Sequence, residues 1–173
     1  PTISNLASSI SVAENQTSVV TVSASHPESI GFTYHLSGTD ATSFSISSSG
    51  EITFNSPPDY ETKTTYSITV SVNDGIYTDS QDLTINIINL NDNSPVISGL
   101  DPSVSVAENQ TAVVTISVSD ADGDTLTYTL SGSQAVYFNI SSSGVITFKS
   151  APDYETKTSY SVTVNVSDNI AIV

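Results

Sequence analysis

The chain has 173 residues, and its 18 acidic residues against 3 basic ones give a net charge of -15. Such a charge repels nucleic acid and anionic membrane surfaces and attracts cations, so we expect neither nucleic-acid binding nor membrane insertion. The chain has no cysteine, which excludes a disulfide scaffold, a thiolate zinc site and a thiol nucleophile.

The first half of the chain alternates apolar and polar residues with a period of two. Such alternation indicates strands that bury one face. In chain order the apolar positions are Ile10 and Val12; Val20, Val22 and Ala24; Phe32, Tyr34 and Leu36; Tyr66, Ile68, Val70 and Val72; and Leu83, Ile85 and Ile87. Ser47–Gly50 lies between apolar pairs, and we predict a hairpin turn there because glycine readily adopts a positive φ.

A short stretch rich in side-chain oxygens follows at Asn89–Pro95. A flexible linker would be longer and rich in glycine and serine, so we predict a tight joint at residues 89–95. Beyond it, Ser11–Thr17 recurs as Ser105–Thr111, at an offset of 94 residues. A unit of this length is a small domain rather than a solenoid repeat, so we predict repeat 1 at residues 1–94 and repeat 2 at residues 95–173.

The second copy has the same alternation as the first. Its apolar positions are Val104 and Val106; Val114, Ile116 and Val118; Leu126, Tyr128 and Leu130; Phe138 and Ile140; Ile146 and Phe148; and Tyr160, Val162, Val164 and Val166. The positions that would match Leu83–Ile87 fall after Val173, so we predict that repeat 2 lacks its last strand. Either Ile170–Val173 covers part of that edge or the edge is left open.

The number and length of these strands indicate the fold class. About seven short strands per copy, without helical periodicity, favour an all-β fold of two tandem Greek-key β-sandwiches, end to end, with an immunoglobulin-like topology. Because the sequence stops within a repeat, we expect the chain to be a piece of a longer repetitive protein.

Several short motifs resemble those of cadherin repeats, across nearly the whole chain. They are Ala13-Glu14-Asn15 and its copy at 107–109, Asp59-Tyr60-Glu61 and its copy at 153–155, the joint Asn89-x-Asn91-Asp92-Asn93-x-Pro95, the pair Asp120 and Asp122, and Asp168. The resemblance implies sandwiches in tandem with calcium bound between consecutive repeats. Calcium prefers six to eight oxygen ligands, which carboxylates, amides and backbone carbonyls supply.

The resemblance also implies which residues would hold two or three Ca²⁺ ions at the interdomain joint. They are Glu14, Asp59, Glu61, Asn89, Leu90, Asn91, Asp92, Asn93, Asp120, Asp122, Asp124 and Asp168, with Leu90 and Asn93 contributing backbone oxygens. Eight of these side chains are carboxylates, which would repel one another without cations. Asn89 stands where the family usually has aspartate, and this loss of a charge leaves the choice between two and three ions open.

The start of the first copy and the end of the second copy lack this complete set of ligands. At the start of the first copy, His26 and Glu28 occupy the positions of Asp120 and Asp122, so we predict no strong calcium site there. At the end of the second copy, Glu108, Asp153 and Glu155 are retained but no joint follows in the sequence, which leaves half a site.

We therefore expect a secreted or cell-surface protein, in particular a bacterial adhesin, whose calcium-bound joints stiffen a tandem array. Its partners would be calcium, neighbouring repeats, and a polysaccharide or host cell surface. The alternative is a carbohydrate-binding module of a secreted polysaccharide-binding or -degrading protein, but the absence of tryptophan counts against it. We expect no enzymatic activity, because the acids gather at a joint rather than in an aromatic-lined cleft.

Overall fold

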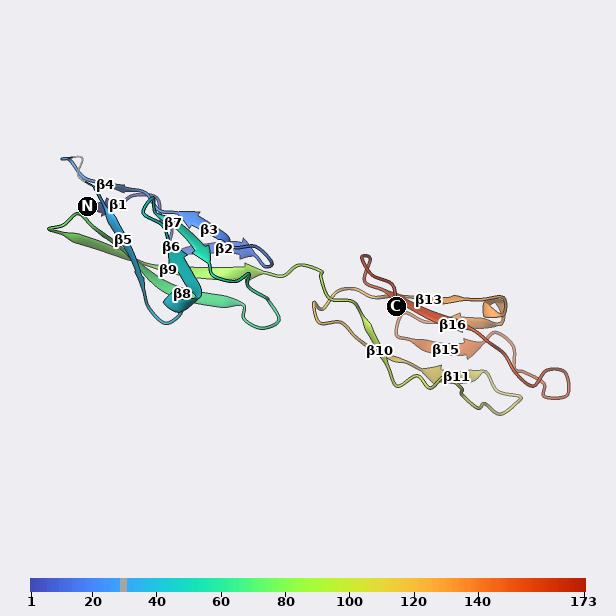
Figure 1. Ribbon diagram of the computed structural model, residues 1–173. Coiled ribbons are helices and arrows are strands. Elements are labelled where there is room, and N and C mark those ends of the chain that lie inside the picture. The colour runs from blue at the N-terminus through green and yellow to red at the C-terminus, as the bar shows by residue number, and fades with distance from the viewer. Residues whose placement is uncertain (29–30) are drawn as a thin grey trace. The chain divides into compact units, whose positions relative to one another are not determined.

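A computed structural model describes residues 1–28 and 31–173 of the chain (Figure 1). The fold is all-β, as the alternation predicts. The chain divides into two compact units, unit 1 (Pro1–Leu90) and unit 2 (Asn91–Val173). None of the helices in the described ranges is long and apolar enough to cross a membrane.

Among its described residues, unit 1 has a four-stranded, a three-stranded and a two-stranded β-sheet (Figure 1). Its elements are β1 (Thr2–Ile3), β2 (Ser9–Ala13), β3 (Ser18–Thr21), β4 (Ala24–Ser25), β5 (Thr33–Ser37), the 3-10 turn η1 (Ala41–Ser43), β6 (Phe44–Ile46), β7 (Glu51–Phe54), β8 (Thr65–Asn73) and β9 (Thr78–Ile88). One sheet has the order β2-β9-β8-β5 and another β3-β7-β6, while β1 pairs with β4. Strand β9 lies between β2, to which it is parallel, and β8, to which it is antiparallel.

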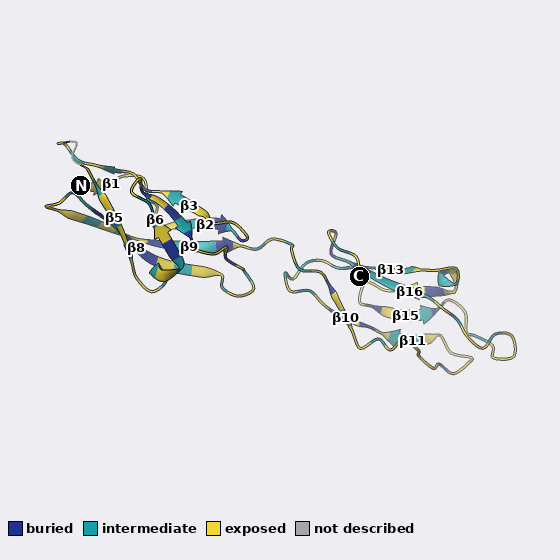
Figure 2. Cartoon of the chain, viewed as in Figure 1, coloured by how far each residue is buried: buried dark blue, intermediate teal, exposed yellow. Residues whose placement is uncertain are grey.

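The alternation predicted from the sequence sets the core of unit 1. Leu83 and Ile85 of β9, and Val70 of β8, are 0% exposed. The residues that alternate with them along each strand are at least partly exposed. Figure 2 shows these buried stretches on β8 and β9. Burying each such side chain contributes about 1.5–3 kcal/mol, so the two long strands carry a large part of the core.

The hairpin turn predicted at Ser47–Gly50 is confirmed. The Gly50 N–H donates to the Ser47 carbonyl at 3.0 Å, and the Ser47 N–H donates to the Glu51 carbonyl at 2.9 Å. The second copy has the same turn, in which the Gly144 N–H donates to the Ser141 carbonyl at 3.0 Å. Gly50 has a φ of +83°, a conformation that L side chains rarely adopt. A Cβ at this position would lie 2.4 Å from the Val22 carbonyl oxygen, so both backbone conformation and space require glycine.

Replacing Gly50 by alanine is therefore expected to destabilise unit 1 by about 2 kcal/mol or more, since it adds a backbone clash to the conformational strain. Gly75 provides a matched control, because it also has a positive φ, of +95°, but no atom lies within 4 Å of its Cβ position. Gly75→Ala should cost only the strain, about 1 kcal/mol. Urea denaturation of the two variants measures the difference, and equal losses would refute the clash.

Unit 2 follows a similar sheet pattern, but its described residues form no counterpart of β2 or β9, and β16 is shorter than its counterpart β8. Its elements are β10 (Val96–Ser98), β11 (Ala112–Thr115), β12 (Ser117–Ser119), β13 (Thr127–Ser131), the 3-10 turn η2 (Ala135–Tyr137), β14 (Phe138–Ile140), β15 (Val145–Phe148) and β16 (Thr163–Ser167). The sheets have the orders β11-β15-β14, β13-β16 and β10-β12. Its core cluster, which includes Ile116, Phe138 and Val166, shares no residue with the core of unit 1.

The strand predicted at Val104 and Val106 is absent, because residues 101–111 belong to no strand. Its counterpart β2 in unit 1 is held by pairing with β9, and the positions that would match most of β9 lie after Val173. For the same reason β16 begins only at Thr163, although the alternation starts at Tyr160. Apolar alternation specifies which face is buried, but a strand also needs a hydrogen-bonded neighbour.

Candidate metal centre

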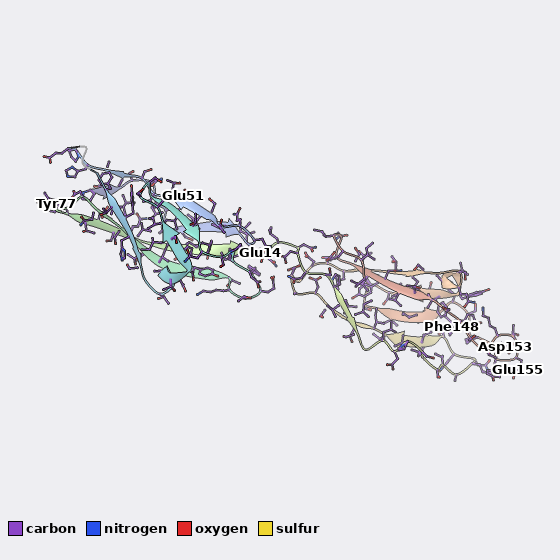
Figure 3. The ribbon with its side chains drawn as sticks, in the orientation of Figure 1. Glu14, Glu51, Tyr77, Phe148, Asp153 and Glu155 are labelled. Atoms are coloured by element: carbon purple, nitrogen blue, oxygen red, sulfur yellow. The ribbon has the colours of Figure 1, made fainter. Side chains whose placement is uncertain are left out.

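Glu14, at the end of β2, organises one end of unit 1. Its side chain is 2% exposed. One carboxylate oxygen accepts the N–H of Tyr60 at 2.7 Å, and the other accepts the N–H of Leu90 at 2.7 Å. Glu14 therefore ties the 58–61 loop to the segment that leaves β9. Figure 3 shows it at the end of unit 1 opposite to Tyr77.

The 58–61 loop brings further carboxylates to the same end of unit 1. Asp59 accepts the N–H of Glu61 at 3.0 Å and the hydroxyl of Thr62 at 2.7 Å. The Thr62 hydroxyl is the main cause that holds the pKa of Asp59 below its usual value. One carboxylate oxygen of Glu14 and one of Glu61 lie within 4.8 Å of each other. These are suitable positions for a shared cation, because two carboxylates so close repel one another.

In unit 2, Asp122 and Asp168 hold the joint residues 91–93 in place. One carboxylate oxygen of Asp122 accepts the N–H groups of Asp92 and Asn93, at 3.0 and 2.8 Å, and the other accepts the Asn93 side-chain amide at 2.8 Å. The amide of Asn91 donates to the Asp168 carbonyl at 3.1 Å. The joint residues, the 120–124 loop and Asp168 thus form one acidic end of unit 2.

Four oxygen atoms at this end are buried without any hydrogen-bond partner among the described residues. They belong to the side chains of Asn91, Asp120, Asp124 and Asp168. Buried polar atoms are rarely left unpaired, because the loss of hydration costs about 1–3 kcal/mol each and more when the group is charged. Three carboxylates and one amide oxygen of this kind are ligands that suit Ca²⁺, so the residues fit the ion that the resemblance implies.

The electrostatics of this end also favour a cation. Carboxylate oxygens of Asp120, Asp122 and Asp124 lie within 4.8 Å of one another. Burial, followed by repulsion from the neighbouring carboxylates, raises the pKa of Asp124 above its usual value. The remaining oxygen of Asp168 accepts the N–H groups of Ile170 and Ala171, at 2.8 and 2.6 Å, which fixes this 2% exposed side chain in place.

The structure groups the acids at the other end of unit 2 as well. Carboxylate oxygens of Glu108, Asp153 and Glu155 lie within 4.8 Å of one another, and all three residues are exposed. Figure 3 shows Asp153 and Glu155 in the loop that follows β15. Glu108 accepts the N–H of Tyr154 at 3.0 Å, just as Glu14 accepts the N–H of Tyr60. Glu14 also accepts the N–H of Leu90 with its other oxygen.

At the remaining end of unit 1, Asp74 takes the position that Asp168 has in unit 2. Its partners are the N–H groups of Ile76 and Tyr77, at 2.9 and 2.7 Å, the N-terminal amine of Pro1 at 3.2 Å and the His26 ring at 3.6 Å. The backbone donors, the Tyr77 N–H first, lower its pKa to about 2. Asp74 and Asp168 thus accept equivalent backbone N–H groups, but His26 lies beside Asp74, whereas the neighbours of Asp168 are acidic.

Because the folded-state pKa of Asp74 is depressed from 3.8 to about 2, its contribution to stability is present above pH 4 and is lost as the pH falls toward 2. We expect Asp74→Asn to lower the urea midpoint of unit 1 at pH 7 and to differ less from the wild type at pH 2. Urea titrations at both values measure this. If the difference in urea midpoint between variant and wild type were the same at pH 7 and pH 2, the low pKa assigned to Asp74 would be wrong.

Sequence reasoning identified the acids of each end but missed the groups that orient them. Thr62 donates to Asp59 at 2.7 Å and Thr156 donates to Asp153 at 2.8 Å, in the same geometry. The signal for these residues is in the sequence, because the run Asp-Tyr-Glu-Thr occurs identically in both copies. Asn15 and Asn109 likewise share a positive φ, of 63° and 61°.

Comparison with protein families gives a different match for each unit. Residues 8–89 match the cadherin domain, and residues 91–171 match the bacterial Ig domain. Among curated relatives, the chain is 38% identical over 146 residues to human protocadherin Fat 4, and 32% identical over 164 residues to mouse cadherin EGF LAG seven-pass G-type receptor 2. These matches cover 76% and 88% of this chain but only 3% and 6% of the relatives.

Solved structures of tandem cadherin repeats resemble the chain as well. Mouse cadherin-23 EC22-24 is 25% identical with a TM-score of 0.78, over 91% of this chain and 56% of that one. Protocadherin gammaB7 EC3-6 is 26% identical with a TM-score of 0.77, over 96% of this chain and 42% of that one. The immunoglobulin-like sandwich predicted from the sequence is thereby confirmed. The chain belongs to the cadherin-like tandem-repeat proteins, with a cadherin domain as its first repeat and, as its second, a repeat that matches the bacterial Ig domain.

Proposed function

We propose that this chain is a calcium-dependent structural module of an adhesion protein, in which Ca²⁺ is held jointly by the end of unit 1 that carries Glu14 and the end of unit 2 that carries Asp122. The observation that carries the proposal is the group of buried, unpartnered oxygens of Asn91, Asp120, Asp124 and Asp168. Such a group is costly to the fold by itself, and a divalent cation would offset that cost.

The chain's own contacts prepare both ends for the ion. Glu14 holds the 58–61 loop against Leu90, and Asp122 holds residues 92–93 against unit 2. Leu90 and Asn91 are covalent neighbours, so the two prepared ends are joined by a single peptide bond. The bound ion would supply positive charge that both ends share, and the number of ions, two or three, depends on how far Asn89 substitutes for a carboxylate.

Repulsion between the carboxylates is the reason why calcium should change the stiffness of the joint. Two unit charges at 4 Å interact by about 1 kcal/mol in water and about 4 kcal/mol near a protein surface. Eight carboxylates gathered from two repeats would therefore separate them in the absence of cations, and Ca²⁺ would stiffen the connection. Extracellular calcium modules bind at about 10⁻⁴ to 10⁻³ M, so this joint should be occupied outside cells.

The module is extracellular, as the sequence predicts. Its structural relatives include the extracellular cadherin domains 1–4 of protocadherin gamma B7, at 25% identity and a TM-score of 0.75. We propose that it serves as one segment of a tandem adhesive array, with neighbouring repeats as its immediate partners. The matched families are cadherin and Ig domains, so we assign the module no enzymatic activity, and nothing in the comparisons supports the alternative of a carbohydrate-binding module.

Calcium titration with thermal melting tests the proposal. In 10 mM Ca²⁺, a site with a Kd of about 10⁻⁴ M adds about 2.7 kcal/mol, so the melting temperature should rise by on the order of 10 °C over that in chelator. Mg²⁺ at the same concentration should act weakly, because it retains its waters and demands stricter geometry. Equal melting temperatures in calcium and chelator would refute the proposal.

A further inference from the structure

Unit 2 carries a small basic and apolar surface patch, formed by Val136, Tyr137, Lys149 and Lys157 (the lysine–tyrosine patch). The chain has three basic residues against 18 acidic ones, and two of the three are in this patch. The ammonium of Lys157 lies 5.4 Å from the centre of the Tyr137 ring, and the Lys149 N–H donates to the Tyr137 carbonyl at 2.8 Å. None of these four residues belongs to the acidic groups at the two ends of unit 2.

At the matching positions of unit 1 the lysine is paired with an acid. The counterparts of the four patch residues, at the offset of 94, are Thr42, Ser43, Asn55 and Lys63. Lys63 forms an ion pair with Asp40. The Asp40 side chain also accepts the Ser67 N–H at 2.8 Å and so connects η1 to β8. Unit 1 therefore presents a polar, neutral surface here.

In unit 2 the acid of this pair is replaced by Gln134. Gln134 keeps the structural contact, because its side-chain oxygen accepts the Ser161 N–H at 2.6 Å. It does not keep the charge, and among the described residues neither lysine of the patch has an ion-pair partner. The ammonium of Lys157 lies instead 4.6 Å from the centre of the Tyr160 ring. Such a contact contributes only about 0.5–1 kcal/mol at an exposed site, so the positive charge remains available to an anion.

The position of the patch is a property of the repeat fold. In unit 1, where β9 is present, Lys63 lies at the same 4.6 Å from the centre of the Tyr66 ring. Thr42 is exposed there, as its counterpart Val136 is in unit 2. The two copies thus place the same positions at the surface and differ in the side chains that fill them.

Tyr137 is held in place by its neighbours. Its N–H donates to the Gln134 carbonyl at 3.1 Å, in addition to the bond that its carbonyl accepts from Lys149. The Tyr137 ring meets the Tyr160 ring edge-on, with centres 5.6 Å apart. Phe148, labelled in Figure 3, packs against Tyr160 with ring centres 5.0 Å apart. An aromatic ring fixed in this way loses little conformational entropy when a ligand binds.

We propose that the lysine–tyrosine patch binds a uronic acid residue of an acidic polysaccharide. The C–H face of the sugar ring would pack on Tyr137 and Val136, which are 49% and 65% exposed. The carboxylate of the sugar would accept charged hydrogen bonds from the ammonium of Lys157. Lys149 would attract the carboxylate of an adjacent sugar. A uronic acid combines an apolar ring face with a negative charge, and the patch offers the complement of both.

The size of the patch favours a sugar over a protein partner. A fully buried aromatic side chain contributes about 150–250 Å², so four partly exposed side chains offer on the order of 300 Å². A stable protein interface buries about 800 Å² on each partner. Acids farther away than about 8 Å are largely screened at physiological salt. Asp153 and Glu155 precede Lys157 in the same loop, so we expect a weak affinity for each sugar.

Titration with a short oligomer of galacturonic acid, followed by NMR amide shifts, tests the site. We expect saturable shifts at residues 135–137, 149 and 157, and weaker binding as the salt concentration rises, because exposed charges are screened. A galactose oligomer of the same length lacks the carboxylates and should not bind. The titrations are made in chelator, so a negative result would leave the proposed calcium joint untouched.

Two variants identify the side chains that bind. Tyr137→Ser, which introduces the residue of unit 1, should lower the affinity about 3–10-fold, as expected for the loss of an aromatic contact. Lys157→Gln should lower it about tenfold or more, as expected for the loss of a charged hydrogen bond. The matched controls lie in unit 1, where Tyr77→Ser, at a 68% exposed position, and Lys63→Gln should leave the affinity unchanged.

Three outcomes would overturn the proposal. The first is equal binding of the galacturonic acid and galactose oligomers, or no binding of either. The second is an equal affinity of Lys157→Gln and Lys63→Gln for the galacturonic acid oligomer. The third is equally tight binding of a glutamate oligomer of the same length, because the patch would then recognise carboxylates on an acidic peptide as well as on a sugar.

Discussion

Replacing Asp122 by asparagine is expected to weaken calcium binding about tenfold or more and to loosen the joint residues. The carboxylate accepts three hydrogen bonds from Asp92 and Asn93, and an asparagine amide group cannot accept at both of its terminal atoms. The change also removes one negative charge from the group of Asp120, Asp122 and Asp124. Isothermal titration with Ca²⁺ measures the loss of affinity, for which changes of this kind cost about 10–100-fold.

Glu51→Gln is the charge-matched control, because Glu51 is exposed in β7 and belongs to none of the acidic groups. It should bind calcium like the wild type, while both variants keep the same all-β circular dichroism spectrum. An equal loss of affinity in the two variants would mean that net charge, rather than the end of unit 2, attracts the ion. Unchanged affinity in Asp122→Asn would remove this residue from the proposed site.

Replacing Ile85 by alanine is expected to cost unit 1 about 2–5 kcal/mol. Ile85 is 0% exposed and is in register with both neighbours of β9, Ile10 and Tyr66, so the cavity would open at the centre of the sheet. Unit 2 has a separate core and should keep its own stability. Urea denaturation monitored by NMR amide signals from each unit separates the two effects.

Ile76→Ala is the matched control for this change, because Ile76 is 78% exposed and the same truncation should cost less than about 0.5 kcal/mol. Comparable losses in the two variants would mean that β9 is not the centre of the core. An equal loss in both units for Ile85→Ala would show that the units unfold as one cooperative body.

Much of unit 1 follows from its sequence, since alternation such as Leu83, Ile85 and Ile87 has one physical solution, a strand with one buried face. The turn at Gly50 follows as well, because few other residues adopt its φ of +83°. The missing strand at Val104 shows the limit of such reasoning. Whether an alternating segment pairs depends on a neighbour distant in the sequence, and local pattern holds no information about that neighbour.

The same limit applies to the acidic ends. The resemblance of the motifs to cadherin repeats implies which acids gather, and the structure does bring Asp120, Asp122 and Asp124 within 4.8 Å of one another. The motifs do not show that the two carboxylate oxygens of Glu14 accept hydrogen bonds from the N–H groups of Tyr60 and Leu90. Nor do they show that Asp122 accepts the backbone N–H groups of residues 92–93. Those bonds arise from the loop conformations, which the residue spacing alone does not determine.

The central claim is that calcium stiffens the connection between the two repeats, and small-angle X-ray scattering in calcium and in chelator tests it most directly. We predict a narrower distribution of interdomain distances in about 1 mM Ca²⁺ than in chelator, and a clearly smaller narrowing for Asp122→Asn, whose weaker site would be only partly filled at that concentration. Scattering profiles of the wild type that are identical under the two conditions would contradict the claim.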